Sequence, residues 1–279
     1  MICPQAFHWP PSPWQHFLSG VAGVVLLLQP ADSAPGVTSP AGSSTGATWR
    51  TLPLITDGKI SSDWVHIGWG RFAVAADGLR TECDERGMGL LVYQRERLGD
   101  CRLRVVYRAE KPKSNSGVYV RLDDGILTWT NRPSVAVRRD AKGKLPKDMV
   151  QKLMAASEAE EGVWYAVHHG YEVQIMDDND DAHRTGAIYG LAKAAPLPPA
   201  ADGAWRTMLI TLRENVVTVA VDGKQLSRFD AASPDLPPRQ RWTEPKRDAP
   251  RPVAGYIALQ NHDPGDVVFF KAVSVAPLD

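Results

Sequence analysis

Short segments of alternating polarity, separated by turn residues, run from Trp49 to the end of this chain and limit the folds that it can adopt. The clearest is VVTVAVDGKQLSRF, in which two alternating runs flank Asp222-Gly223, a dipeptide favoured in tight β-hairpin turns. In CRLRVVYRAE, Leu103 and Val105 alternate with arginines. Because side chains alternate between the two faces of a strand, each segment would bury one face. The pattern predicts an all-β sandwich or jelly roll of antiparallel strands.

Two segments depart from the strand pattern. Residues 140–162 contain a helical pattern over about Lys147 to Glu160, which we expect to form a short helical insert between strands. Residues 230–252 are rich in proline and arginine and predict a long surface loop. Loops of this length often form the walls of binding sites, and a merely tolerated insertion is the equal alternative.

The first 48 residues differ from the rest. The apolar run FLSGVAGVVLLL is short for a membrane span and has the length of a signal-peptide core, and small residues near Ala34 suit cleavage. We expect a signal peptide over residues 1–34, a disordered leader over 35–48, a single domain over 49–279, and export to the periplasm or the exterior. No lysine or arginine precedes the apolar run, although export signals normally begin with one, so a misassigned start codon or a short anchor is the alternative.

The charge balance and the cysteine content limit which partners, disulfides and metal sites the chain can have. Lys plus Arg and Asp plus Glu each number 32, so nothing electrostatic favours nucleic acid or an anionic membrane as partner. In an exported protein Cys83 and Cys101 could form a disulfide, and two buried free thiols are the equal alternative. No Cys/His cluster has the spacing of a zinc site, and the sequence requires no cofactor while leaving a divalent metal open.

Three segments, SGVYVRLDD, YEVQIMDD and GYIALQNHD, predict strands with one apolar face and one face of hydrogen-bonding side chains. If the strands are neighbours, their polar faces form one groove. Gln and Arg can bond pairs of sugar hydroxyls, and Tyr can stack on a sugar ring, so we expect a carbohydrate ligand; a solvated sheet face is the alternative. The apolar positions are Val118, Val120, Val173, Ile175, Ile257 and Leu259, and the polar positions are Tyr119, Arg121, Glu172, Gln174, Gln260 and His262.

Carboxylates stand out in YEVQIMDD because glycosidases place two of them around the bond they cleave. Regular alternation puts Asp177 on the core face, and a one-residue bulge would return it to the side of Glu172. The run DDNDDAH also has the composition of an exposed acidic loop. We therefore expect Glu172 to be catalytic and keep Asp177 as a second choice.

Several motifs occur in an order that resembles the 3-keto-disaccharide hydrolase family over roughly Leu54 to Leu278. The segments LITDGKISSDWVHIG, FAVAADGLRTE and LGDCRLRVVYR are similar to the early part of the family pattern, the last two with substitutions. The more specific matches are NSGVYVR, GYEVQIMDD, TGAIYG and GYIALQNHD.

This resemblance implies a concanavalin A-like jelly roll of two antiparallel sheets and action on glycosides already oxidised at C3. The insert at residues 124–163 and Asp263, where the family more usually has Gly, depart from the family pattern and bear on substrate choice. The catalytic candidates are Glu172, His262 and Asp177, and the substrate-binding candidates are Asn115, Tyr119, Arg121, Gln174, Tyr189 and Gln260.

Two mechanisms and three functions stay open at this point. A ketone at C3 acidifies the C2 proton, so Glu172 or His262 could remove it, expel the C1 substituent and let water add; Arg121 or Asn115 would then face the C3 oxygen. Ordinary two-carboxylate hydrolysis is the competing mechanism. The alternative functions are a non-catalytic, lectin-like carbohydrate-binding module and an adhesion domain whose groove the 124–163 insert would fill.

Overall fold

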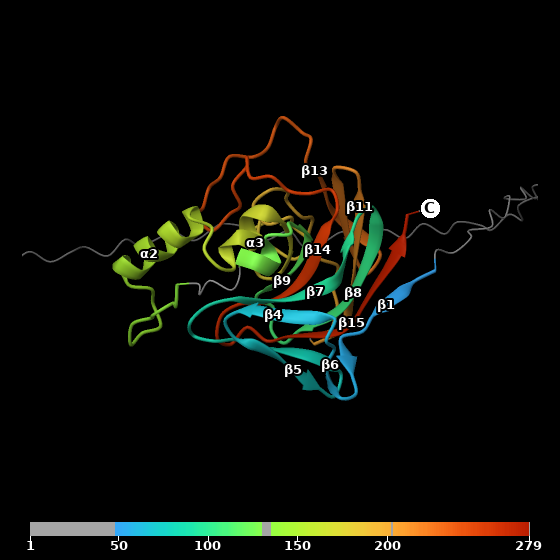
Figure 1. Ribbon diagram of the computed structural model, residues 1–279, viewed down its shortest axis with the longest axis horizontal. Coiled ribbons are helices and arrows are strands. Elements are labelled where there is room, and N and C mark those ends of the chain that lie inside the picture. Colours follow the sequence, from blue (N-terminus) through green and yellow to red (C-terminus); the bar gives the residue numbers. More distant parts are fainter. Residues whose placement is uncertain (1–47, 130–134, 202, 279) are drawn as a thin grey trace, which may run out of the picture. The chain divides into compact units, whose positions relative to one another are not determined.

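The structure is a computed structural model that describes residues 48–129, 135–201 and 203–278. Strands dominate it, and helices occur only between β9 and β10 in the described residues (Figure 1). The strands are β1 (Arg50–Leu52), β2 (Ile55–Thr56), β3 (Lys59–Ile60), β4 (Trp64–Gly68), β5 (Arg71–Ala75), β6 (Gly78–Glu82), β7 (Gly89–Leu98), β8 (Cys101–Ala109), β9 (Ser116–Leu122), β10 (Tyr171–Ile175), β11 (Arg206–Arg213), β12 (Val216–Val221), β13 (Lys224–Asp230), β14 (Gly255–Asn261) and β15 (Val268–Pro277). The helices are α1 (Ile126–Trp129), α2 (Lys147–Glu158) and α3 (Trp164–His169).

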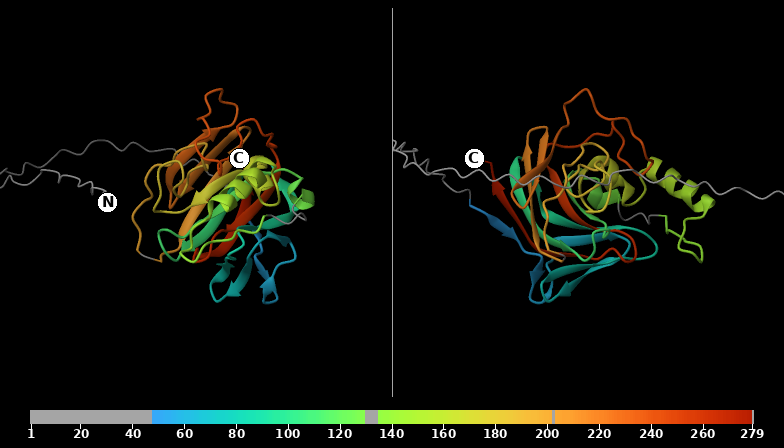
Figure 2. Two further views of the ribbon diagram at one scale, coloured as in Figure 1. Left: turned by 90° about the vertical axis from the view of Figure 1, so that its left-hand side faces the viewer. Right: turned by 180° about the vertical axis from the view of Figure 1, so that it is seen from behind.

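The strands form two antiparallel sheets. The larger runs in the order β13-β12-β11-β8-β15-β6-β5 with β1 added to β15, and the five-stranded sheet runs β10-β9-β14-β7-β4, while β2 and β3 pair separately. The predicted hairpin joins β12 to β13, and both turn residues, Asp222 and Gly223, have positive φ, 50° and 81°, as a tight hairpin turn requires. The strands of both sheets curve (Figure 2). The predicted all-β, two-sheet antiparallel sandwich of jelly-roll type is confirmed.

Apolar side chains from both sheets form one core between them. The positions predicted from alternation are each at most 1% exposed and share one buried cluster with Leu103, Ile210 and Val219 of the larger sheet. Burial of one such aliphatic side chain stabilises the fold by about 1.5–3 kcal/mol, and a slip of one residue would turn them all to the wrong face. The core therefore fixes the register of the strands that carry the polar face. The confirmed core positions are Val118, Val120, Val173, Ile175, Ile257 and Leu259.

The opposite face of the five-stranded sheet, called here the outer face, is partly covered by helices. Tyr119 of β9 and Ala258 of β14 pack there against Ala166 and Val167 of α3. In Figure 1, α3 lies over β9 and β14, whereas α2 lies to one side of the sheets. The outer face is therefore a partly roofed surface rather than an open groove.

The predicted helical insert is present as α2, which ends at Glu158. No sequence pattern predicts α1 or α3, because four and six residues are too few to show helical periodicity. All of α3 except Trp164 is buried, so packing on the outer face rather than local propensity stabilises it. Between Asp230 and Gly255 the chain has neither helix nor strand, as expected for a long loop.

Cys83 and Cys101 are free thiols and do not form a disulfide with each other. Of the two alternatives predicted from the sequence, the structure therefore has the free thiols. Burial raises the pKa of each thiol to about 11, which keeps both protonated at neutral pH. No helix in the described part of the chain is long and apolar enough to cross a membrane. The expected signal peptide, and the expected leader up to residue 47, lie outside the described residues.

Candidate active site

The candidate site is built on three adjacent strands at the outer face. Glu172 of β10 is the direct cross-strand partner of Tyr119 on β9, and Ala258 of β14 pairs with Tyr119 from the other side. The Tyr119 hydroxyl donates a hydrogen bond of 2.8 Å to Glu172 Oε2, and Gln260 Nε2 donates one of 3.4 Å to the Tyr119 oxygen. Neighbouring strands thus hold a carboxylate, a phenol and an amide in one chain of hydrogen bonds.

These groups line a pocket, called here the glutamate pocket. Trp164 and Val167 of α3, Thr243 of the 231–254 loop and Met88 form part of its wall. Among the described residues that line it, Glu172 is the only carboxylate. Seven of the nine sequence-predicted site residues meet here: Asn115, Tyr119, Glu172, Gln174, Tyr189, Gln260 and His262.

Gly117 leaves room for the Glu172 side chain. Gly117 lies two residues before Tyr119 on the same face of β9, beside Glu172 on the neighbouring strand. A Cβ atom at residue 117 would lie 2.6 Å from Glu172 Oε1 and 2.9 Å from its Cγ. The glycine of the SGVYVR motif therefore permits the carboxylate to lie flat across β9.

The Glu172 side chain has an unusually high pKa for a carboxyl group. Burial raises its pKa to about 7, and the hydrogen bond from Tyr119, the charge of His262 and the contact with Gln260 partly oppose that rise. The side chain is half-buried, so it stays accessible from the pocket. At neutral pH, protonated and ionised forms of Glu172 coexist, as suits a group that exchanges protons.

His262 follows β14 and faces two further carboxylates. Its Nδ1 lies 3.4 Å from Asp266 Oδ2 and 3.8 Å from Asp263 Oδ2. Burial alone lowers the His262 pKa, but Asp266, Asp263 and Glu172 outweigh burial and raise it above the ordinary value. The raised pKa increases the share of the imidazolium form, so His262 can act as a proton donor as well as the base considered from the sequence.

Three amide oxygens in the pocket accept no hydrogen bond from the described residues: Asn115 Oδ1, Gln174 Oε1 and Gln260 Oε1. Buried polar atoms rarely stay unsatisfied, because an unpaired acceptor costs about 1–3 kcal/mol. All three belong to residues that line the glutamate pocket. They provide acceptors for the hydroxyl groups of a ligand.

Arg121 does not join this pocket, although simple alternation placed it beside Tyr119. On β14, Tyr256 pairs with Leu122 of β9, and Ala258 pairs with Tyr119. The single residue between them, Ile257, therefore lies opposite two residues of β9. Arg121 is one of these two, and it has a positive φ of 54°. This β-bulge breaks the alternation. Arg121 instead lines a separate pocket with Tyr171, a residue of the inter-sheet core.

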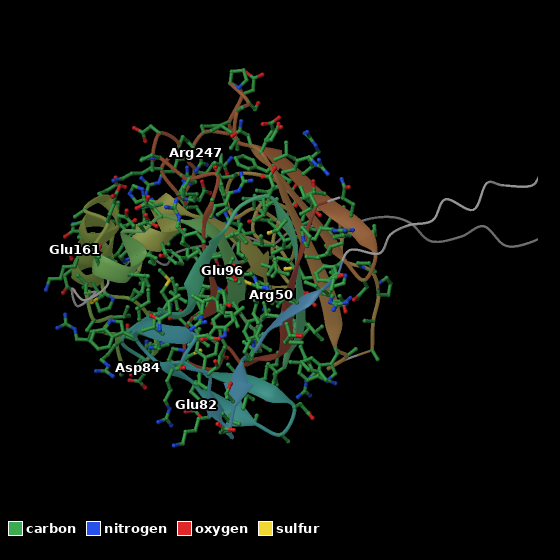
Figure 3. The ribbon with its side chains drawn as sticks, turned by 45° about the vertical axis from the view of Figure 1, so that its right-hand side comes forward. Arg50, Glu82, Asp84, Glu96, Glu161 and Arg247 are labelled. Atoms are coloured by element: carbon green, nitrogen blue, oxygen red, sulfur yellow. The ribbon has the colours of Figure 1, made fainter. Side chains whose placement is uncertain are left out.

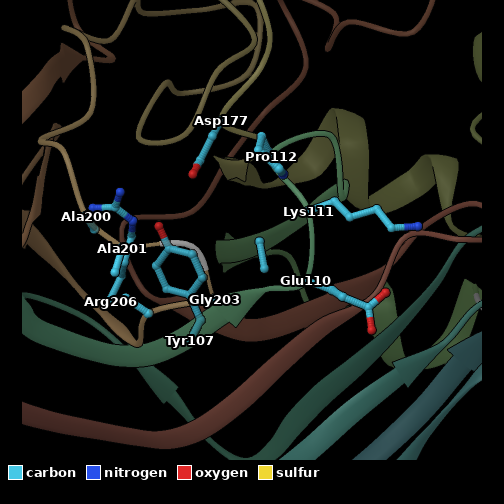
Figure 4. Close-up of a pocket in the computed structure, with 11 residues that line it drawn as sticks. Tyr107, Glu110, Lys111, Pro112, Asp177, Ala200, Ala201, Gly203 and Arg206 are labelled. Carbon is cyan, nitrogen blue, oxygen red and sulfur yellow. The ribbon is translucent and has the colours of Figure 1, made fainter.

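Asp177 is also outside the glutamate pocket. Its Oδ1 accepts a hydrogen bond of 2.5 Å from Thr185 Oγ1, and it lines another pocket with Tyr107, Lys111 and Arg206. Figure 4 shows Asp177 facing Tyr107 and Arg206 across that pocket. β10 ends at Ile175, and no bulge in it returns Asp177 to the side of Glu172; Asp177 instead lines its pocket with Tyr107, a residue of the inter-sheet core.

The sequence analysis missed four wall residues: Met88, Trp164, Val167 and Thr243. Trp164 stacks obliquely on Trp242 with ring centroids 5.4 Å apart, which joins α3 to the 231–254 loop. The only sequence signal for any of them was the long loop, for which a binding-site wall was one of two equal alternatives. No group of three His, Cys, Asp or Glu side chains in the described residues has a metal-binding arrangement.

Comparison with known proteins places this chain in a family. The model of the 3-keto-alpha-glucoside-1,2-lyase-like domain matches residues 49–276. The chain belongs to this family. The resemblance seen in the sequence motifs is thereby confirmed. A search of curated proteins finds no match.

Solved structures share the fold at low sequence identity. Two proteins from Parabacteroides distasonis, provisionally described as glycosyl hydrolases, align with TM-scores of 0.54 and 0.50 at 20% and 16% identity. The first alignment covers 83% of this chain and 100% of that protein, the second 80% and 91%. A carbohydrate-binding module from Bacillus subtilis aligns with a TM-score of 0.43 at 10% identity over 77% of this chain and 95% of its own. At 20% and 16% identity, the likeness to the two Parabacteroides proteins shows the fold alone.

Proposed function

We propose that this protein cleaves the glycosidic bond of a glycoside that carries a ketone at C3, and that Glu172 begins the reaction by removing the C2 proton. The observation that carries the proposal is the pKa of Glu172, raised to about 7 in a pocket of hydrogen-bonding groups. A general base works best when its pKa lies near the working pH. Membership of the family supports a 3-keto-glycoside as substrate.

In the first step Glu172 takes the C2 proton, and the electron pair of the C–H bond moves onto the C3 oxygen. The developing oxyanion needs N–H or O–H donors nearby. The amides of Asn115 and Gln174 line the pocket and can turn an N–H towards that oxygen. The Tyr119 hydroxyl donates to Glu172 and so holds the base in a fixed position.

In the second step the electron pair returns to form the C1=C2 double bond, and the C1–O bond breaks. The leaving oxygen takes a proton, which the His262 imidazolium can supply, because neighbouring carboxylates raise its pKa. Addition of water across the double bond then gives the free 3-keto sugar. The net reaction is hydrolysis by elimination and hydration.

Ordinary two-carboxylate hydrolysis has less support. It requires a second carboxyl group about 5–9.5 Å from the first, on either side of the bond that is cleaved. Among the described residues lining the pocket, Glu172 is the only carboxylate, and Asp177 lines a different one. The ionisable pair in the pocket, Glu172 and His262, therefore favours elimination by a base and a proton donor.

The proposal is tested by product analysis with a 4-nitrophenyl 3-keto-glucoside and the matched unoxidised glucoside. We expect nitrophenol from the keto compound only, because the unoxidised sugar lacks an acidic C2 proton. Equal release from both compounds would contradict the elimination route and favour direct hydrolysis. Saturable binding of either sugar without turnover would favour the carbohydrate-binding module.

A further inference from the structure

A second pocket, called here the arginine pocket, lies between the 231–254 loop and strands β9, β10 and β13. It encloses about 190 Å³. Arg121, Arg247 and Arg251 all line it, together with the aromatic residues Tyr171 and Phe229. Arg247 lies at the top of Figure 3, in the loop. No carboxylate is among the described residues that line this pocket.

Arg121 is buried without a hydrogen-bonding partner. It is 1% exposed, and its Nε and Nη2 donate to no described residue. The nearest carboxylate oxygen is Asp100 Oδ1, 3.6 Å from Nη2, and that oxygen already accepts a hydrogen bond from the Glu214 amide. Burial lowers the pKa of Arg121. A buried guanidinium in this state is costly unless something else pairs with it.

Arg251 is oriented but not neutralised. Its guanidinium donates to the carbonyl oxygens of Gly170, Ala249 and Lys246 at 2.8–3.1 Å. It also lies 5.2 Å from the ring centroid of Tyr171. Carbonyl groups fix the plane of a guanidinium without cancelling its charge, and the charge of Asp248 acts on Arg251 from outside the pocket lining.

Arg247 differs, because Glu244 lies 2.9 Å from its Nη2. Arg121 and Arg251 thus add positive charge to a pocket whose described lining contains no carboxylate, since Asp100 and Asp248 act on them from outside that lining. Cations around one small volume attract an anion.

We propose that the arginine pocket binds a small oxyanion, either a carboxylate or a phosphate. Guanidinium groups present planar N–H donors that match both. The volume of about 190 Å³ equals that of several water molecules at about 30 Å³ each, so it accommodates inorganic phosphate or a short organic acid. The arginine pocket lies on the side of the inter-sheet core rather than at the glutamate pocket. The proposal of an anion site therefore does not depend on the proposed glycoside chemistry.

Isothermal titration of the full chain tests this site, with inorganic phosphate in one series and acetate in another, at an ionic strength held constant with chloride. We expect saturable one-site binding of at least one anion, and the tighter of the two identifies the ligand class. Arg121→Gln and Arg251→Gln should each weaken binding about tenfold or more, since each removes a charged donor. Arg213→Gln is the matched control, because it removes an exposed charge on β11 and should leave binding unchanged. No saturable binding of either anion, or equal affinity in all variants, would overturn the proposal.

A second measurement covers the case in which the buried variants do not fold. Crystals of the wild-type protein soaked in sodium selenate should show an anomalous selenium peak between the guanidinium groups of Arg121 and Arg251. Selenate is a tetrahedral oxyanion like phosphate, so this soak tests the phosphate case. Anomalous peaks elsewhere only, or none, would refute a phosphate site.

Discussion

The two faces of β9 and β10 carry two pockets whose polar groups are balanced in different ways. On the outer face, Glu172 is bonded to Tyr119, and the unsatisfied atoms nearby are neutral amide oxygens. On the core side, the adjacent residue Tyr171 and the bulged Arg121 line a pocket of cations. Neutral acceptors suit a polyhydroxy ligand, whereas unpaired guanidiniums suit an anion. Residues next to one another in the sequence therefore line pockets of different chemistry.

The largest expected effect is the loss of turnover in Glu172→Gln, which affects the glutamate pocket and leaves the arginine pocket unchanged. Glu172→Gln keeps the size of the side chain and removes the base, so turnover of a 3-keto-glucoside should fall by about 10²–10⁴ with substrate affinity nearly unchanged. Steady-state kinetics measures both quantities. Glu110→Gln, in the pocket of Asp177, is the control and should keep full activity.

Two outcomes would change the assignment of the base. Activity that survives Glu172→Gln but is lost in His262→Ala would assign the base to His262. Activity that survives both changes would remove the glutamate pocket from the chemistry. Phosphate binding in the arginine pocket should be the same in all these variants.

Gly117→Ala should reduce turnover by about 10–100-fold, because the new methyl group would push the Glu172 carboxylate from its position, and displacements of about 1 Å can cost 10²-fold. Gly99→Ala is the matched control, since its added Cβ would meet only Ala254 at 3.8 Å. Kinetics and melting temperatures should be measured together. A loss of activity only in proportion to lost folded protein would count against the role of Gly117 in placing Glu172.

Tyr119→Phe should shift the pH dependence of kcat/KM. The wild-type acid limb should bend near pH 7, because Glu172 must be ionised to act as base. The Tyr119 hydrogen bond lowers the Glu172 pKa, so its removal should move the limb to higher pH. An unmoved acid limb would show that another group controls it. The alkaline limb, from deprotonation of His262, should stay in place.

The smallest expected effect is on stability. The folded state raises the Glu172 pKa to about 7, so the proton that it holds favours folding at low pH, and this contribution is lost as pH rises from the unfolded pKa near 4.5 through 7. Glu172→Gln removes the dependence. The melting temperature of the variant relative to wild type should therefore rise between pH 4.5 and pH 8. A constant difference would mean that the pKa of Glu172 is not raised.

The sequence predicted the elements whose side chains alternate regularly. Val173 and Ile175 on β10 identify the core face, and the same alternation assigns Glu172 and Gln174 to the outer face. It failed at Arg121, where a non-glycine residue adopts positive φ in a bulge that pattern alone does not reveal.

The wall residues of the glutamate pocket were harder to predict than Glu172, its general base. Trp164 belongs to a helix that forms only by packing on the outer face, and Thr243 lies in a loop without periodicity. Tertiary contacts place both residues, so no local pattern in the sequence could assign them to the site.

The most direct test of the central role of Glu172 is the isotope at C2 of the sugar product after turnover in D₂O. The reaction is stopped at low conversion, and the free 3-keto sugar incubated alone gives the correction for spontaneous exchange. Removal of the C2 proton followed by hydration predicts one solvent deuterium at C2 in the product from the wild-type protein, and little product of any kind from Glu172→Gln. Full turnover with the original hydrogen retained at C2 would contradict the account.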